Sequence, residues 1–246
     1  MTASWIVALS FFTVSTVLLT SGINALQSNS QAPANRVFFA LTMAIAIWSA
    51  GMALSAAAAT AAAGEVFRRI SAVGWSTAYA ILLHLILVVT GKVKQKRSFM
   101  VLLYTPALLG LLAFAVPGKL NPRPYLLQQT AYGWINVAQH NLWDWFFYAY
   151  YLGYSLFALW LLARWEGATQ DQAEKKKART LFLAILSALA LGTLTDVILS
   201  SIFSAWPQMA PLIMLVPVFS IDHALKKDSF QVTEGVNRKT NYITLF

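Results

Sequence analysis

The strongest constraint on this chain is a series of seven apolar stretches that divide it almost from end to end. They cover residues 3–25, 36–63, 70–91, 99–116, 143–162, 180–203 and 209–225. A helix that crosses about 30 Å of hydrocarbon needs roughly 20 mostly apolar residues. The pattern therefore predicts an all-α, polytopic membrane protein: a seven-transmembrane helix bundle over residues 1–225, followed by a short basic cytoplasmic tail, residues 226–246.

The composition excludes a large soluble domain. Apolar and aromatic residues make up 58% of the 246 residues and charged residues only 11%, whereas soluble domains carry about 25% charged residues. The chain has no cysteine, which excludes disulfides, thiolate metal sites and cysteine nucleophiles. Any function must therefore arise inside the bilayer, at its faces or through a partner.

Basic residues are divided unevenly between alternate gaps. One set of gaps and the tail hold 14 of them: Arg36, Lys92, Lys94, Lys96, Arg97, Arg164, Lys175, Lys176, Lys177, Arg179, Lys226, Lys227, Arg238 and Lys239. The opposite set holds four: Arg68, Arg69, Lys119 and Arg123. Because cytoplasmic loops are enriched in Lys and Arg, this predicts an N-terminus outside and a C-terminus in the cytoplasm. Topology and attraction to anionic headgroups explain the basic runs, and we expect no nucleic-acid binding.

Two features describe the first half of the bundle. No Lys or Arg precedes the first stretch and no clear small-residue cleavage site follows it, which favours a retained helix over a signal peptide. The second stretch is rich in small residues, including Ser49, Gly51 and Ser55. Since small residues let helix backbones approach one another in lipid, we expect this helix inside the bundle.

The longest outside gap, residues 117–142, contains prolines and aromatic residues. Tyr132 and Trp134 lie in it, and Trp143 and Trp145 follow it. Tyr and Trp favour the membrane interface, so an aromatic belt is the default interpretation. A lid over an outward-facing pocket is the alternative, because loops of this length are often functional.

Asp196 is the principal candidate for a ligand-binding or switch residue. It follows Thr195 in the outer half of the sixth stretch, and ionisable groups within a membrane are costly and usually functional. A structural hydrogen bond to a neighbouring helix is the alternative. Asp144, Trp134 and Tyr154 complete the predicted ligand-binding set in the outer half, although an interfacial carboxylate at 144 and an aromatic stripe containing Tyr154 also fit solvation and packing.

Proline marks the fourth stretch at Pro106 and the seventh at Pro211 and Pro217. Each proline removes a backbone donor and tends to kink a helix. A bend at Pro211 or Pro217 could transmit motion towards the cytoplasm, and a packing kink without a signalling role is the alternative.

The remaining ionisable residues do not predict a catalytic, haem or metal site. His84 is interpreted as an interhelical hydrogen-bonding residue, since His140 and His223 are not placed to complete a haem site with it. Asp222 and His223 are expected to be solvated at the inner end of the seventh stretch. The sequence contains no phosphate-binding loop, metal-spaced His/Glu set or nucleophile motif. We expect no enzymatic activity, no metal and no cofactor.

Several local motifs resemble the N-terminal seven-transmembrane sensor region of bacterial histidine kinases and diguanylate cyclases, over roughly residues 1–225. The residues that carry the resemblance are Asn35-Arg36, Trp48, a Phe67-Arg68-Arg69 turn leading to Trp75, Tyr148-Ala149-Tyr150-Tyr151-Leu152, the basic run 175–179 and Asp196. The resemblance implies a stimulus sensed by the bundle and passed through the seventh helix to a catalytic domain. It also implies that the chain is integral to a bacterial cytoplasmic (inner) membrane. Only residues 226–246 follow here, with no kinase, cyclase or coiled-coil segment.

Three functions remain open at this point. The first is a sensory or receptor-like module that binds a signal, such as a lipid or another hydrophobic ligand, and relays it to an output kinase or cyclase. The second is a non-catalytic structural or accessory subunit of a larger membrane complex. The third, a small transporter, rests on helix number and Asp196. The lipid bilayer is a partner in each, and the first two also require a protein partner.

Overall fold

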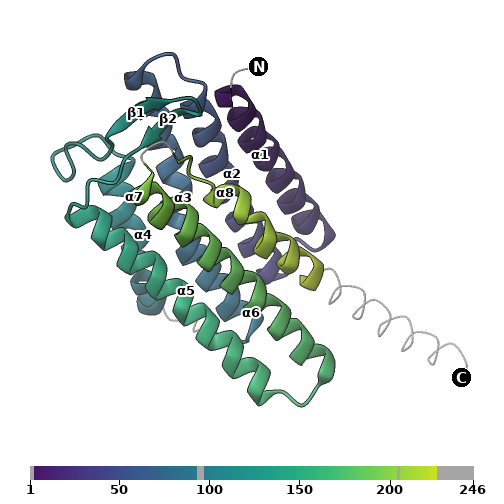
Figure 1. The fold of residues 1–246 in the computed structure, drawn as a ribbon. Helices are drawn as coiled ribbons and strands as arrows, with labels where there is room; N and C mark the ends of the chain where they lie inside the picture. The colour runs from purple at the N-terminus through teal and green to yellow at the C-terminus, as the bar shows by residue number, and fades with distance from the viewer. Residues whose placement is uncertain (1–2, 93–96, 204–205, 226–246) are drawn as a thin grey trace, which may run out of the picture.

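The computed structural model describes residues 3–92, 97–203 and 206–225, which form a helical bundle closed at one end by a β-hairpin (Figure 1). The elements are α1 (Ala3–Ser28), α2 (Pro33–Ala56), α3 (Ala61–Val89), α4 (Arg97–Phe114), β1 (Leu127–Thr130), β2 (Gly133–Asn136), α5 (Leu142–Ala168), α6 (Gln172–Thr193), the π-helix η1 (Leu194–Leu199), α7 (Ser200–Ile202) and α8 (Ala210–Ile213). The predicted tail, residues 226–246, lies outside the described residues.

The predicted helix bundle is confirmed. Five helices are long and apolar enough to cross a membrane: α1, α2, α3, α5 and the continuous helical run Gln172–Ile202, which joins α6, η1 and α7. Two shorter apolar helices complete the set, Ser98–Phe114 and Ala210–Leu225. The second of these is called the last helix below; it comprises α8, a turn at Met214 and a further helical run. The chain is an integral membrane protein.

The boundary between the second and third helices differs from the prediction. The alanine-rich run was assigned to the second stretch, but α2 ends at Ala56 and α3 begins at Ala61. Thr60 has an extended backbone, and its hydroxyl accepts a hydrogen bond from the amide of Ala63 at 3.2 Å. Such an N-cap starts a helix even within an apolar run. Phe67-Arg68-Arg69 therefore lies inside α3, and the predicted turn there is wrong.

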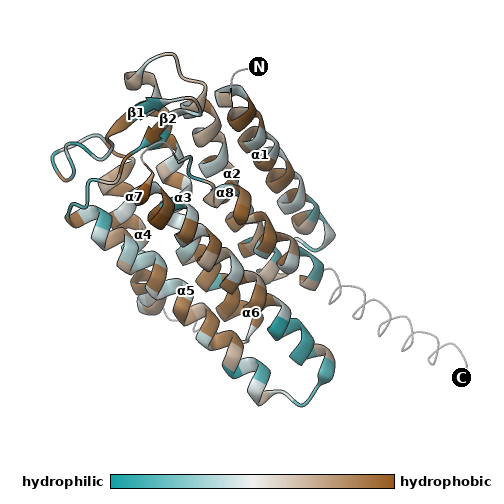
Figure 2. Ribbon diagram, in the orientation of Figure 1, coloured by the Kyte–Doolittle hydropathy of each residue, from teal (hydrophilic) through white to brown (hydrophobic). Residues whose placement is uncertain are grey.

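The sixth helix also begins earlier than predicted. Asp171 caps α6 by accepting a hydrogen bond from the amide of Ala173 at 2.8 Å. The basic run 175–179 consequently forms the first turns of the helix. In Figure 2 the hydrophilic residues of this end contrast with the hydrophobic middle of the bundle.

α2 lies inside the bundle, as its small residues predicted. It is the most buried of the five long helices, and glycines on α2 and α3 bring the two backbones together. A Cβ atom added at Gly51 would lie 2.6 Å from Ser71, and one added at Gly74 would lie 2.2 Å from the carbonyl oxygen of Ala44. Close van der Waals packing therefore joins the two helices.

The outer segment also contains a short β-hairpin, which the sequence analysis did not predict. β1 and β2 pair antiparallel, with Gln128 opposite Ile135. Gly133 has a φ of 94° and packs so closely on α2 that an added Cβ would lie 2.2 Å from the carbonyl oxygen of Ala56. The Trp134 indole donates to the carbonyl of Ala58 at 2.9 Å. These contacts fix the hairpin to the α2–α3 connection.

Candidate functional site

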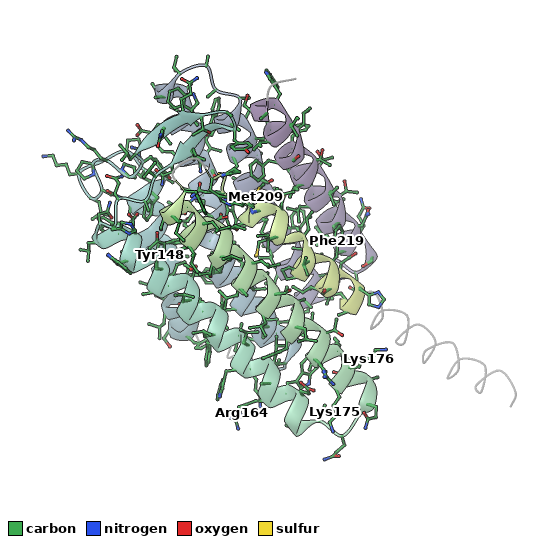
Figure 3. The ribbon with its side chains drawn as sticks, in the orientation of Figure 1. Tyr148, Arg164, Lys175, Lys176, Met209 and Phe219 are labelled. Carbon is green, nitrogen blue, oxygen red and sulfur yellow. The ribbon has the colours of Figure 1, made fainter. Side chains whose placement is uncertain are left out.

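A cavity of about 160 Å³ lies inside the bundle at the hairpin end. Helices α2 to α6, η1 and the last helix contribute to its wall, and Asn136 and Ala138 border it from the outer segment. Its polar side chains include Arg68, Asp144 and Asp196. In Figure 3 Tyr148, which lines the cavity, and Met209 both lie towards the hairpin end.

Arg68 is the most enclosed charged residue of this site. It is 6% exposed, and α3 carries it into the bundle beneath the hairpin. Its Nε donates to the Ser55 hydroxyl at 3.2 Å, and its Nη2 donates to the carbonyl of Trp134 at 2.9 Å. Nη1 lies 2.9 Å from the Met52 sulfur and donates to the side-chain oxygen of Gln208. The guanidinium therefore joins α2, the hairpin and the segment before the last helix.

Asp196 binds the start of the last helix. It lies in η1, and its Oδ1 accepts hydrogen bonds from the amides of Met209 at 2.6 Å and Ala210 at 3.1 Å. Its Oδ2 is also 3.1 Å from the Ala210 amide, and the Thr195 hydroxyl donates to Oδ1 at 2.8 Å. An acidic group suits the unpaired amides at the start of a helix.

Arg68 and Asp196 together hold residues 208–210 from two sides. Arg68 bonds the side chain of Gln208, and Asp196 bonds the backbone of the next two residues. A cation on α3 and an anion on η1 thus fix the connection between the sixth helix and the last helix. Below, this arrangement is called the 208–210 clamp.

Asp196 lies within an unusual piece of helix. η1 is a π-helix over Leu194–Leu199, and single π-turns inside α-helices are frequent at functional sites. The Ser200 hydroxyl donates to the carbonyl of Asp196 at 2.6 Å. Gly192 also lines the cavity, and an added Cβ there would meet no atom of the described residues within 4 Å. The helix is therefore irregular where it borders the cavity.

The structure brings part of the predicted ligand-binding set together. Asp196 and Asp144 both line the cavity. Thr195 is not among the lining residues, but its hydroxyl donates a hydrogen bond to Asp196. The side chain of Trp134 anchors the hairpin, while its carbonyl accepts from Arg68. Tyr154 is not among the lining residues; its hydroxyl donates to the carbonyl of Leu103 on α4 at 2.9 Å.

The two prolines predicted to bend the seventh helix lie in different structural contexts. Pro211 occupies the first turn of α8, where a missing amide donor costs little. Pro217 borders the cavity and lies four residues after Ile213, the last residue of α8. Since proline cannot donate to the carbonyl four residues before it, Pro217 accounts for the helix interruption at Met214.

Tyrosine hydroxyls connect the elements around the cavity through the main chain. Tyr150 donates to the carbonyl of Ser76 at 3.0 Å and accepts from the amide of Ala80 at 3.0 Å. Tyr125 donates to the carbonyls of Phe114 and Arg68 at 3.1 and 3.2 Å. Burial raises the pKa of the Tyr125 hydroxyl, which keeps it protonated as a donor.

Sequence reasoning missed Arg68 and Gln208 and misplaced Asp222. Arg68 was assigned to a loop, because the start of α3 was placed too late, and its positive charge in a chain of few charges was the available signal. Asp222 was expected to be solvated but is 8% exposed, since the last helix packs this face on the bundle.

His84 makes the expected interhelical contact: its Nδ1 lies 2.9 Å from the Tyr104 hydroxyl and joins α3 to α4. Within the described ranges, no three His, Cys, Asp or Glu side chains form a metal-binding group.

The comparisons with known proteins address the whole bundle. A family model described as the N-terminal 7TM region of histidine kinase matches residues 8–223. A comparison with curated proteins finds no match. The family match covers the hairpin, every residue that lines the cavity, and all of the helices except the first residues of α1 and the last two residues of the last helix.

Proposed function

The chain belongs to the family of N-terminal 7TM regions of histidine kinases, and we propose that it senses a small ligand in the cavity beneath the hairpin. In this proposal, a ligand that binds in the cavity changes the contacts of the 208–210 clamp and thereby moves the last helix. The observation that carries the proposal is the clamp itself. Two of the charged residues that border the cavity, Arg68 and Asp196, also hold the start of the last helix.

The distribution of charge supports an outward-facing cavity. Arg164, Lys175 and Lys176 lie at the end of the bundle opposite Tyr148 and Met209 (Figure 3). The start of α1 lies at the hairpin end (Figure 1). Because Arg68 and Arg69 lie inside α3, only Lys119 and Arg123 remain as basic loop residues on the hairpin side. The positive-inside rule then favours the hairpin end outside and the α5–α6 connection in the cytoplasm.

Movement of the last helix is the proposed output signal. The helix leads from the clamp towards the end of the bundle that carries the basic residues (Figure 3). Its interruption at Met214 gives it a point where the angle between its two parts can change. The family membership supports a histidine kinase as the partner that receives this movement.

A cavity-filling variant tests this relay without knowledge of the ligand. Gly192→Leu places a side chain in the open space at the cavity wall. Because the natural chain lacks cysteine, spin labels can be attached at Leu183→Cys on α6 and Phe219→Cys on the last helix, two exposed positions. We expect Gly192→Leu to shift the distance distribution between the labels, measured by double electron–electron resonance in nanodiscs.

Gly153→Leu on α5 is the matched control. It is also a helical glycine with no described atom within 4 Å of an added Cβ, but it does not border the cavity. Its distance distribution should equal that of the parent double-cysteine chain. An unchanged distribution in Gly192→Leu would contradict the relay.

A further inference from the structure

We propose that the cavity beneath the hairpin binds an organic ammonium ion, held by aromatic rings and by the carboxylates of Asp144 and Asp196. The inference rests on the proposed sensing function and specifies the chemistry of its ligand. Three observations carry it: the aromatic wall, the charge balance of the lining and the size of the cavity.

Aromatic side chains form much of the cavity wall. The rings that line it include those of Trp75, Tyr79, Phe114, Phe147, Tyr148 and Tyr151. Phe147 is central, with its ring centroid 4.5 Å from that of Trp75 and 5.4 Å from that of Tyr151. Aromatic faces carry negative electrostatic potential and attract a cation within roughly 6 Å of the ring centroid. The wall therefore favours a cation over an anion.

The charged residues of the lining also favour a cation. Arg68 contributes one positive charge, and Asp144 and Asp196 contribute two negative charges. The guanidinium has five N–H donors and already contacts four acceptors on Ser55, Met52, Gln208 and Trp134. It therefore lacks the pair of available donors that a bidentate grip on a carboxylate or phosphate requires.

Both carboxylates retain capacity for a ligand. A carboxylate offers about four lone-pair sites. The hydrogen bonds of Asp196 fall mainly on Oδ1, and among the residues that the structure describes Oδ2 accepts only from the Ala210 amide. At Asp144, the amides of Gln139 and Asn141 both donate to Oδ2. Arg68 balances the negative charge of one carboxylate, and a bound ammonium ion would balance that of the other.

The size of the cavity limits the ligand group that enters it. Its volume is about 160 Å³, and an engineered cavity of about 150 Å³ admits benzene. A trimethylammonium group or a substituted amine fits this space. Free solutes and lipid headgroups both carry such groups, so the shared chemistry is the ammonium ion itself.

A charged probe and its neutral shape analogue test this chemistry. Choline and 3,3-dimethylbutan-1-ol have the same shape and differ in the charge of one atom. We expect choline to bind the chain at least about tenfold more tightly, because cation–π and carboxylate contacts act only on the charged probe. Binding is measured by isothermal titration calorimetry in maltoside, which contains no ammonium group. Dihexanoylphosphatidylcholine is titrated in parallel to represent a lipid headgroup.

Two variants locate the binding. Phe147→Leu removes a central ring of the wall, and Phe146→Leu removes a neighbouring ring that does not line the cavity. Phe147→Leu and Asp144→Asn should each reduce the preference for choline over the alcohol several-fold, and Phe146→Leu should not.

Each outcome decides the proposal. Preferential binding of choline supports a free solute, and binding of the phosphatidylcholine alone supports a headgroup. If neither binds more tightly than the alcohol, or if Phe146→Leu and Phe147→Leu have equal effects, the ammonium proposal is overturned. A shift of the last helix in Gly192→Leu would still support the sensing function in that case, so the two failures are distinguishable.

Discussion

At the residue scale, Arg68 shows how a charge is accommodated inside an apolar bundle. Every contact described for its guanidinium is to a neutral acceptor: a hydroxyl, a sulfur, an amide oxygen and a carbonyl. The charge is therefore stabilised by local dipoles, with the carboxylate of Asp196 acting at longer range. Removing such a residue leaves several buried acceptors without donors, which costs more than the bonds themselves contribute.

Arg68→Ala is accordingly expected to lower the free energy of unfolding by about 2–4 kcal/mol, because buried polar partners lose their donor. Arg69→Ala is the matched control on the same helix. Arg69 pairs with Glu65 four residues away on the same helix, and their side chains are 15% and 42% exposed. Loss of this single partly exposed pair should cost only about 0–1 kcal/mol. Thermal unfolding in maltoside, followed by circular dichroism, compares the two. Equal losses would show that Arg68 has no special structural role.

The candidate site illustrates what residue patterns reveal in a membrane protein. Asp196 could be predicted because a carboxylate in the middle of an apolar stretch has few explanations. Arg68 could not be placed, since alanine is compatible with either side of a helix boundary and the cap at Thr60 is a single weak signal. Gln208 carries no sequence signal, because an amide near a helix end is ordinary; only its contact with Arg68 gives it importance.

At the element scale, the hairpin is the part that sequence patterns did not reveal. Its strands have four residues each, which is too short for a clear alternation of polar and apolar residues. The helices were predictable because their apolar runs extend over many turns. The hairpin is instead fixed by tertiary contacts with α2, including the close approach of Gly133 to Ala56.

Gly133→Ala is expected to detach the hairpin from the α2–α3 connection. The φ of 94° and the 2.2 Å approach to the carbonyl of Ala56 leave no room for a Cβ atom, and such strain costs of order 1–3 kcal/mol. Hydrogen exchange at the amides of residues 127–136 should become faster. Gly118→Ala in the same outer segment meets no described atom within 4 Å and should leave the exchange unchanged. Unaltered exchange in Gly133→Ala would disprove the tight packing of the hairpin.

At the scale of the whole molecule, the bundle has two chemically different ends. The hairpin end contains the cavity and the 208–210 clamp, and the opposite end contains the basic start of α6 (Figure 3). The proposed relay requires this polarity, because it places the signal and the output on opposite sides of the membrane. The proposed orientation therefore decides whether the cavity faces outside or into the cytoplasm.

Cysteine labelling measures that orientation directly. Ala131→Cys lies at the exposed hairpin turn and Gln170→Cys in the exposed α5–α6 connection. In intact cells, a membrane-impermeant maleimide should label position 131 and should label position 170 only after permeabilisation. The reverse pattern would place the cavity on the cytoplasmic side. The parent chain, with no cysteine, gives the background.

The second prediction at this scale is that the chain forms a complex with another protein. Gentle extraction followed by native mass measurement should recover the chain with a second protein, since a sensory module needs an output. A histidine kinase in that complex would support signalling, whereas a different membrane complex would favour an accessory subunit. Recovery of a stable monomer alone would count against both.

The tyrosine contacts around the cavity have a consequence for how relatives of this chain can diverge. Tyr150, Tyr154 and Tyr125 all bond main-chain oxygens of neighbouring elements. Every residue type carries that oxygen, so these bonds place no demand on the side chains at positions 76, 103 and 114. Mutations can accumulate at those positions without loss of the bonds. The architecture can thus persist in evolution while the sequence around it drifts.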